Sequence, residues 1–157
     1  MIICPRERFA GAFLLYLSND AQKNYLHCPD RLDGELVRGV AQSYGGISLA
    51  MKDLAKIGRL YLDGGVWNGR RIVSEEWIRQ STAYDTSNEG YHFNWYNTSS
   101  SGMRKPAHPG TYALGIKGQV LYFNPDQDLI MVRLGLTTAE PAFIPELFEE
   151  LANVWPE

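Results

Sequence analysis

Two apolar runs in the last third of the chain predict a β-hairpin. Residues 119–123 and 129–134 are rich in β-branched and aromatic side chains, and the polar stretch 124–128 separates them. Apolar runs of strand length on both sides of a Pro/Asp/Asn cluster are typical of antiparallel strands joined by a longer turn. Arg133 is the only charged residue in the second run, so we expect that strand to be buried on one face and open at one end.

Four residues stand immediately before this hairpin: Gly115, Ile116, Lys117 and Gly118. Glycine lets a backbone bend sharply or come close to a ligand. The pattern alone therefore leaves two interpretations open, a bulged entry into a core hairpin or a turn that faces a ligand.

The segment after Ser48 has helical periodicity. One apolar face consists of residues at 4-3-4 spacing: Ala50, Leu54, Ile57 and Tyr61. Ser48 is the expected N-cap, and residues 63–65, Asp-Gly-Gly, are expected to end the helix because glycine accepts the left-handed conformation there. Three basic residues on or near the opposite face are expected to be solvated: Lys52, Lys56 and Arg59.

A second hairpin and a second helix are predicted next. Asn68 and Gly69 lie between short apolar pieces within residues 66–73, which is the strongest short-range hairpin pattern. Ser74 is followed by two carboxylates, as expected at the start of a helix, where a serine caps the chain and acidic groups complement the helix dipole.

The aromatic residues 91–96 predict a strand, and the polar, serine-rich residues 97–110 predict a long loop suited to a mobile flap or to binding. Pro145 is expected as the first residue of a C-terminal helix that lies across the sheet. Its predicted apolar face consists of Ile144, Leu147, Phe148, Leu151 and Val154. Helices around an antiparallel sheet, without alternating βαβ units, predict the α+β class.

The apolar run 9–17 imitates a secretory signal because Arg6 and Arg8 precede it. Glu7 interrupts the basic region, and residues 18–20, Ser-Asn-Asp, make a poor cleavage site. We therefore interpret the run as a buried helix or strand, and the sequence leaves the compartment open. The 157 residues fit a single domain, 1–157, within which the segment 1–43 has no further assignment.

Composition excludes several classes of partner. The net charge of −3 is spread along the chain without a basic stripe, so nucleic acid is not an expected partner. No segment approaches the ~20 apolar residues of a membrane span. Cys4 and Cys28 cannot form a disulfide framework, although one bridge between them is left open. Cys28 and the three histidines match no metal-ligand spacing, so no metal or other cofactor is expected.

Three stretches together resemble the C-terminal part of the serine β-lactamase-like hydrolases, a superfamily that includes class C β-lactamases, DD-peptidases, related esterases and aminohexanoate-oligomer hydrolases. Residues 45–77 contain the typical runs D-L-A-x-x-G, G-G-x-W-N-G and S-x-x-W. Residues 91–96 resemble the aromatic strand of the superfamily, and residues 112–135 resemble the strand of its third catalytic motif with the partner strand. The resemblance implies a β-lactamase or penicillin-binding-protein-like C-terminal part over residues 44–157.

The resemblance also implies acyl transfer from an amide or ester to a serine within S-x-x-K, helped by a Y-x-N tyrosine and a K-T-G or H-x-G strand. Ala113, Leu114 and Gly115 align with that strand, so alanine replaces the basic residue and the glycine is kept. Gly115 then clears space for a substrate, and the backbone N–H of Ile116 completes the oxyanion hole. The implied substrate contacts are Tyr112, Ala113, Lys117 and Trp95, with a solvated lysine as the plainer interpretation of Lys117.

The chain contains no S-x-x-K motif. None of its nine serines is followed three places later by lysine, and Ser48 misses by one position. No G-x-S-x-G elbow occurs either. Tyr122, Phe123 and Asn124 spell Y-x-N, but they lie downstream of the third motif, so we interpret Tyr122 as structural.

These residues support three hypotheses. The first is a C-terminal half of a β-lactamase-like serine hydrolase, truncated and inactive alone, whose amide or ester substrate binds once the missing half completes the site. The second is a non-catalytic binding module with a cleft formed by Trp95, the 97–110 loop and the Gly115 edge. The third is a structural piece that completes a sheet with another chain or forms a homo-oligomer. Members of the superfamily often act in the bacterial cell envelope.

Overall fold

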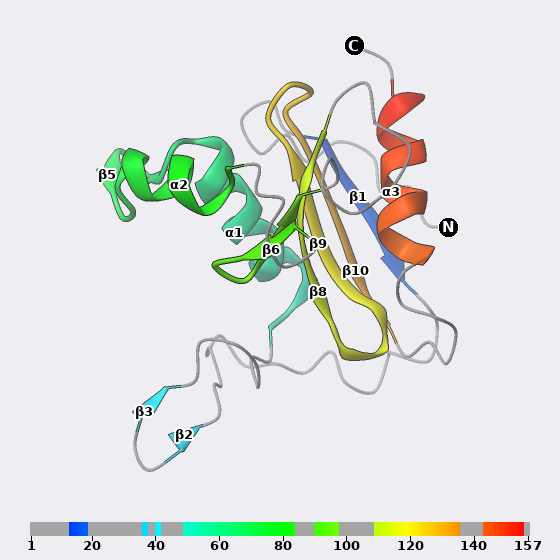
Figure 1. Ribbon diagram of the computed structural model, residues 1–157, viewed down its shortest axis with the longest axis horizontal. Helices are drawn as coiled ribbons and strands as arrows, with labels where there is room; N and C mark the ends of the chain where they lie inside the picture. The colour runs from blue at the N-terminus through cyan, green and yellow to red at the C-terminus, as the bar shows by residue number, and fades with distance from the viewer. Residues whose placement is uncertain are drawn as a thin grey trace.

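The computed structural model describes residues 13–18, 36–37, 40–41, 49–83, 90–97, 109–135 and 143–155. A six-stranded sheet has the strand order β1-β10-β9-β8-β7-β6 (Figure 1). Its strands are β1 (Phe13–Ser18), β6 (Tyr91–His92), β7 (Trp95–Asn97), β8 (Thr111–Gly115), β9 (Gln119–Asn124) and β10 (Leu129–Leu134). All neighbours are antiparallel except β1, which lies parallel to β10. The predicted β9–β10 hairpin is confirmed, and the N-terminal apolar run contains a strand.

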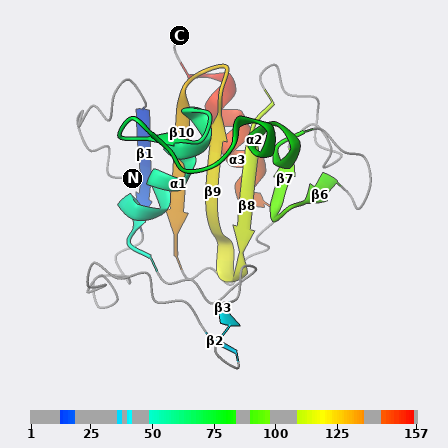
Figure 2. The same ribbon diagram turned by 90° about the vertical axis from the view of Figure 1, so that its left-hand side faces the viewer.

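Helices cover both faces of the sheet. Helix α1 (Met51–Leu62) packs on one face and α3 (Phe143–Asn153) on the other, while α2 (Glu75–Ser81) lies on the α1 side (Figures 1 and 2). Two small separate hairpins consist of β2 (Leu36–Val37) with β3 (Val40–Ala41) and β4 (Val66–Trp67) with β5 (Arg70–Arg71). This arrangement confirms the predicted α+β class with an antiparallel sheet flanked by helices. Among the described residues, no helix has the length and apolar character needed to cross a bilayer.

The two core clusters follow the alternation of side chains along β9. Val120 and Tyr122 belong to the cluster under α3, whereas Leu121 and Phe123 belong to the cluster under α1. Because both faces are covered, the central strands read as continuous apolar runs instead of alternating ones. The expectation that β10 is buried on one face only is therefore wrong, since residues 129–132 are all buried.

Helix α1 begins later than predicted. Its N-cap is Ala50, which makes no side-chain capping bond, and Ser48 lies outside the described residues. The most deeply buried positions of the helix are Met51, Ala55 and Gly58, while the predicted Leu54, Ile57 and Tyr61 pack at the margin of the same cluster. A Cβ on Gly58 would lie 3.2 Å from a methyl group of Ile130. Glycine at this position lets the helix approach the sheet closely.

Arg59 is paired, contrary to the expectation that it is only solvated. Its side chain is 12% exposed and forms ion pairs with Asp63 and, at 2.6 Å, with Asp128. Burial lowers the pKa of Arg59, but hydrogen bonds to the two carboxylates outweigh this effect, so its pKa is raised. Arg59 thus ties the end of α1 to the β9–β10 turn. Lys56 is exposed. Among the described residues, its ammonium group pairs only with the Asp53 carboxylate of the same helix, at 2.5 Å.

The predicted hairpin and helix around Ser74 are confirmed. Asn68 (φ 49°) and Gly69 (φ 74°) form the tight turn between β4 and β5, as expected for a two-residue hairpin loop. The backbone N–H of Trp77 donates to Ser74 Oγ at 3.1 Å and so caps α2. Both elements form from signals that lie within a few residues of one another.

The single strand expected over residues 91–96 is wrong. These residues form a hairpin, in which Phe93 (φ 47°) and Asn94 (φ 67°) make the turn between β6 and β7. The chain reverses at these two residues because consecutive positive φ values match the twist of a two-residue hairpin loop.

The C-terminal helix lies across the sheet as predicted, with differences in detail. It begins at Phe143, so Pro145 is its third residue and not its first. Ile144, Phe148 and Ala152 form the buried face, whereas Val154 is 77% exposed beyond the last helical residue. The expected loop residues 98–108, and also Cys4 and Cys28, lie outside the described residues.

Candidate functional site

The turn between β8 and β9 is the most exposed apolar feature of the sheet. Gly115 ends β8 opposite Gln119, and residues Ile116–Gly118 form the turn between the two strands. Lys117 (φ 60°) adopts the left-handed conformation, which is uncommon for a residue with a Cβ. The Ile116 side chain is 83% exposed. A backbone kept in this conformation at the surface marks a candidate functional turn, because such strain persists only where surrounding contacts enforce it.

The Gln119 side chain makes two hydrogen bonds next to the turn. Its Nε2 donates to the carbonyl oxygen of Gly135, and its Oε1 accepts from the Gly135 N–H at 2.9 Å. The amide group therefore pairs with both backbone groups of a residue that follows β10. This paired contact joins the start of β9 to the end of β10 directly beneath the turn.

The Arg133 side chain reaches the turn itself. Its Nη1 donates to the carbonyl oxygen of Gly118 and lies 3.5 Å from that of Lys117. Partial burial lowers the pKa of Arg133, although a guanidinium stays charged in proteins. A Cβ on Gly135 would lie 3.0 Å from the guanidinium, so glycine there makes room for this approach. Arg133 therefore contacts the turn directly, and the Gln119–Gly135 contact lies beside it.

We expect Gln119→Ala to loosen the contact between the start of β9 and Gly135 measurably. The substitution removes two hydrogen bonds, each worth about 1 kcal/mol, so the free energy of unfolding should fall by about 1–2 kcal/mol. Amide hydrogen exchange should accelerate at Gly135, whose N–H loses its acceptor. Asn153→Ala, at the exposed end of α3, is the control and should change stability by less than about 0.5 kcal/mol. Unchanged exchange at Gly135 would contradict the role given to Gln119.

The structure brings together some of the predicted site residues and separates others. Gly115, Ile116 and Lys117 lie together at the exposed turn. Ala113 is partly buried in the cluster under α1, and Tyr112 is 4% exposed and stacks on Tyr96 with ring centroids 5.1 Å apart. Tyr112 thus belongs to the core under α3, four residues before the turn begins at Ile116.

Trp95 also lies in the core. It is 8% exposed, its Nε1 donates to the Tyr61 hydroxyl at 3.1 Å, and its ring packs against Tyr61 and Phe123. These contacts hold α1 on the sheet. The assignment of Trp95 as a substrate contact stays a prediction, and the observed contacts are those of a packing residue.

Tyr122 is structural, as its position downstream of the third motif predicts. It is fully buried, and burial followed by the charge of Glu149 raises its pKa far above the usual range. A Cβ on Gly110 would lie 2.3 Å from the Tyr122 ring, so the ring packs directly on that glycine backbone. Glu149 Oε1 accepts from the Gly110 N–H at 3.3 Å.

Sequence reasoning assigned no role to Gln119 or Arg133. The available signal was Arg133 itself, one charge within an otherwise apolar strand. A buried charge needs hydrogen-bond partners, but the sequence does not say that these partners are the carbonyls of a turn 15 residues away.

Comparison with known proteins finds a similarity over part of the chain. No protein-family model matches the chain. Over 109 residues the chain is 31% identical to the 6-aminohexanoate-dimer hydrolase of Paenarthrobacter ureafaciens, a match that covers 61% of this chain and 26% of the relative. The chain thus corresponds to about a quarter of that relative's length. The observed α+β fold agrees with the fold class expected from the resemblance to the β-lactamase-like hydrolases.

Proposed function

We propose that this chain is the C-terminal, substrate-facing portion of a β-lactamase-like serine hydrolase that cleaves amides or esters by acyl transfer to a serine. The observation that carries the proposal is the exposed turn after β8, in which Lys117 has a positive φ and whose carbonyl oxygens accept hydrogen bonds from Arg133. It occurs in a chain with partial similarity to a hydrolase. Gly115 and Ile116 occupy this turn at the position where the resemblance expects the third motif.

The chemistry assigns each residue of the turn a distinct part. Attack of a serine Oγ on the substrate carbonyl moves negative charge onto the carbonyl oxygen, and a fixed N–H donor stabilises that oxygen. The Ile116 backbone N–H is this donor in our proposal, and Gly115, without a side chain, leaves room for the substrate. Lys117 lies next in the turn, where its ammonium group can contact an acidic group of the substrate.

A rigid donor matters because hydrogen-bond donors that are already in position need no reorganisation during the reaction. The contacts of Gln119 and Arg133 with the turn and its surroundings supply that rigidity. Displacing the turn by even 1 Å would weaken catalysis far more than binding, since the contact forms fully only in the transition state.

The nucleophile of the proposed reaction is not in this chain. None of its nine serines has a lysine three places later, and arginine, which follows Ser101 at that spacing, cannot act as a base. The serine and its lysine must come from other polypeptide sequence that completes the site. In our proposal the chain alone is inactive.

The purified chain should therefore leave acyl substrates intact. We expect no turnover of nitrocefin or p-nitrophenyl esters above the buffer rate, and no covalent labelling by a fluorophosphonate probe detected by mass spectrometry. A class C β-lactamase treated in parallel is the positive control. Robust turnover together with a labelled serine would contradict the proposal that the chain lacks the nucleophile.

Inactivity alone does not identify the parent reaction, so a second observation is needed. The DNA immediately upstream of the Met1 codon should encode, in frame, an S-x-x-K motif followed by Y-x-N. An upstream region that encodes neither motif, together with an inactive chain, would favour a non-catalytic module over the hydrolase.

A further inference from the structure

Two aromatic side chains meet at the surface on the α1 side of the sheet. Trp77 of α2 and Phe93 of the β6–β7 turn have ring centroids 5.0 Å apart in an edge-to-face arrangement. Trp77 is 41% exposed and Phe93 is 54% exposed. We call these two rings the Trp77–Phe93 platform. Large apolar rings contribute most when they are buried, so a pair left half in water is available for a further contact.

The backbone of Phe93 is strained. Its φ of 47° lies in the left-handed region, which costs a bulky residue energy and usually holds glycine, asparagine or aspartate. The next residue, Asn94, is suited to its own positive φ of 67°. Burial does little to offset the strain at Phe93, because more than half of the side chain is exposed. Such an outlier leads from structure to a hypothesis of function.

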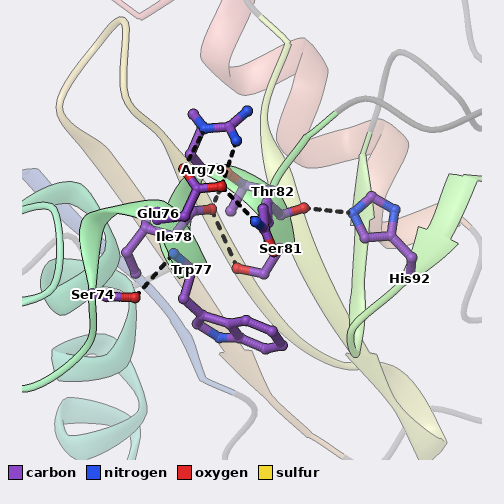
Figure 3. Close-up of polar contacts among 9 residues, drawn as sticks. Ser74, Glu76, Trp77, Ile78, Arg79, Ser81, Thr82 and His92 are labelled. Atoms are coloured by element: carbon purple, nitrogen blue, oxygen red, sulfur yellow. Dashed lines mark hydrogen bonds and ion pairs between the residues drawn. The ribbon is translucent and has the colours of Figure 1, made fainter.

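The platform is held in place by contacts beneath it. Ser74 Oγ caps the first turn of α2 at the Trp77 N–H, and His92 Nε2 lies within hydrogen-bond distance, 3.2 Å, of the Gln80 carbonyl oxygen (Figure 3). The second contact joins the β6–β7 hairpin to α2. The His92 ring also meets Phe93 edge to face, with centroids 5.3 Å apart. A surface fixed in this way loses little conformational freedom when it binds a ligand.

The charges beside Trp77 largely cancel. Arg79 donates two hydrogen bonds to the Glu76 carboxylate, one of them at 2.9 Å (Figure 3). The hydrogen bond from Arg79, followed by that from Gln80, lowers the pKa of Glu76, so this pair stays ionised and mutually compensated near neutral pH. Two of the three charged residues of α2 thus offset each other's charge. This arrangement suits an uncharged apolar group on the rings.

Strand register places the platform at the same end of the sheet as the turn after β8. Tyr96 pairs with Tyr112 in an antiparallel ladder, so each step from Tyr96 toward Phe93 corresponds to a step from Tyr112 toward Gly115. The β6–β7 turn and α2 both lie on the α1 side of the sheet (Figures 1 and 2). The rings therefore lie toward the end of the sheet at which β8 ends.

We propose that the Trp77–Phe93 platform binds the uncharged aliphatic chain or aromatic ring that adjoins the carbonyl of an amide or ester ligand. This inference rests on the proposed function, because it places that carbonyl at Gly115 and Ile116. The rings supply apolar contact area, and the turn supplies the polar contact. The ligand class is therefore an amide or ester with an uncharged apolar substituent next to its carbonyl.

The test uses the whole ¹⁵N-labelled chain and N-phenylhexanamide, a neutral amide with a five-carbon alkyl group on its carbonyl. Titration followed by two-dimensional NMR should shift the Trp77 indole N–H, the Phe93 amide and the Ile116 amide along saturable curves with one common Kd. The indole N–H of Trp95 is the internal control. It donates to Tyr61 within the core and should not move.

Phe93→Asn separates binding from folding. Asparagine accepts the left-handed conformation, so the Tm should stay unchanged or rise, whereas loss of the ring should weaken the Kd about fivefold. Val154→Ala removes an apolar group that is 77% exposed after α3 and should leave the Kd unchanged. A lower Tm for Phe93→Asn with an unchanged Kd would overturn the inference and make the ring a packing residue.

The two proposals fail in different ways. Shifts at Ile116 without shifts at Trp77 and Phe93 would overturn the platform and leave the proposed function standing. Shifts at the rings without Ile116 would support the platform as an apolar ligand site and count against the proposed oxyanion turn. No saturable shift, or shifts of the ring signals that depend on protein concentration without ligand, would overturn the platform, the latter by making it a contact between copies of the chain.

Discussion

Replacing Phe148 by alanine should lower the free energy of unfolding by about 3–5 kcal/mol, the usual cost of removing a fully buried aromatic ring. Phe148 is 0% exposed and meets the Tyr122 ring edge to face at 6.1 Å. Its cluster also contains Leu129 and Met131, both at 0% exposure. The cavity left behind would lie between α3 and the two central strands, where closely packed strands leave little room for collapse.

Urea denaturation followed by far-UV circular dichroism would measure this loss. Val154→Ala provides the control because its side chain is 77% exposed just beyond the same helix, and it should change stability by less than about 0.5 kcal/mol. If both substitutions cost the same, α3 does not pack on the sheet in solution as it does in the structure.

Gly65→Ala should be the second strongly destabilising substitution, at about 2–5 kcal/mol from backbone strain and overlap combined. Gly65 has a φ of 86°, and a Cβ there would lie 2.2 Å from the carbonyl oxygen of Val73. The Gly65 carbonyl accepts from the N–H groups of Ile72 and Val73 at 2.8 and 3.1 Å. Relief of the overlap would break this junction, which connects α1 to the segment that leads into α2.

The neighbouring glycines make matched controls for this substitution. Gly64 (φ 60°) and Gly69 (φ 74°) share the left-handed conformation, but a Cβ on either would meet nothing within 4 Å. Alanine at these two positions should cost only about 1–2 kcal/mol, from backbone strain alone. Thermal unfolding of the three variants separates strain from overlap. Equal losses at all three positions would refute the expected contact with Val73.

Local elements were predictable because their signals lie within a few residues. The Asn68-Gly69 hairpin loop, the Ser74 cap and the two apolar runs of β9 and β10 all formed as expected. Errors occurred where two local interpretations compete. The aromatic run at residues 91–96 resembles one strand, and only the positive φ at Phe93 and Asn94 reveals a hairpin. Asn94 favours a turn, but no glycine accompanies it within residues 91–96.

Part of the candidate site was predictable from the sequence, and part of it was not. Two glycines and the resemblance led to the turn at Gly115, whose exposed position the structure provides. Neither pattern nor resemblance led to the groups that hold it, since the partners of Gln119 and Arg133 are backbone atoms 16 and 15 residues away. Pairings of this kind depend on how strands stack side by side, and residue identity alone does not encode them.

By itself, the sequence determined the α+β class, the central hairpin, the positions of α1 and α2 to within a few residues, and the absence of an S-x-x-K serine. Tertiary structure alone decided that both faces of the sheet are covered, that Arg59 reaches Asp128 across 69 residues, and that Trp77 meets Phe93. The physical reason is the range of the forces involved. Backbone preferences and periodicity act between near neighbours in the chain, whereas burial and ion pairing act between residues that only the folded chain brings together.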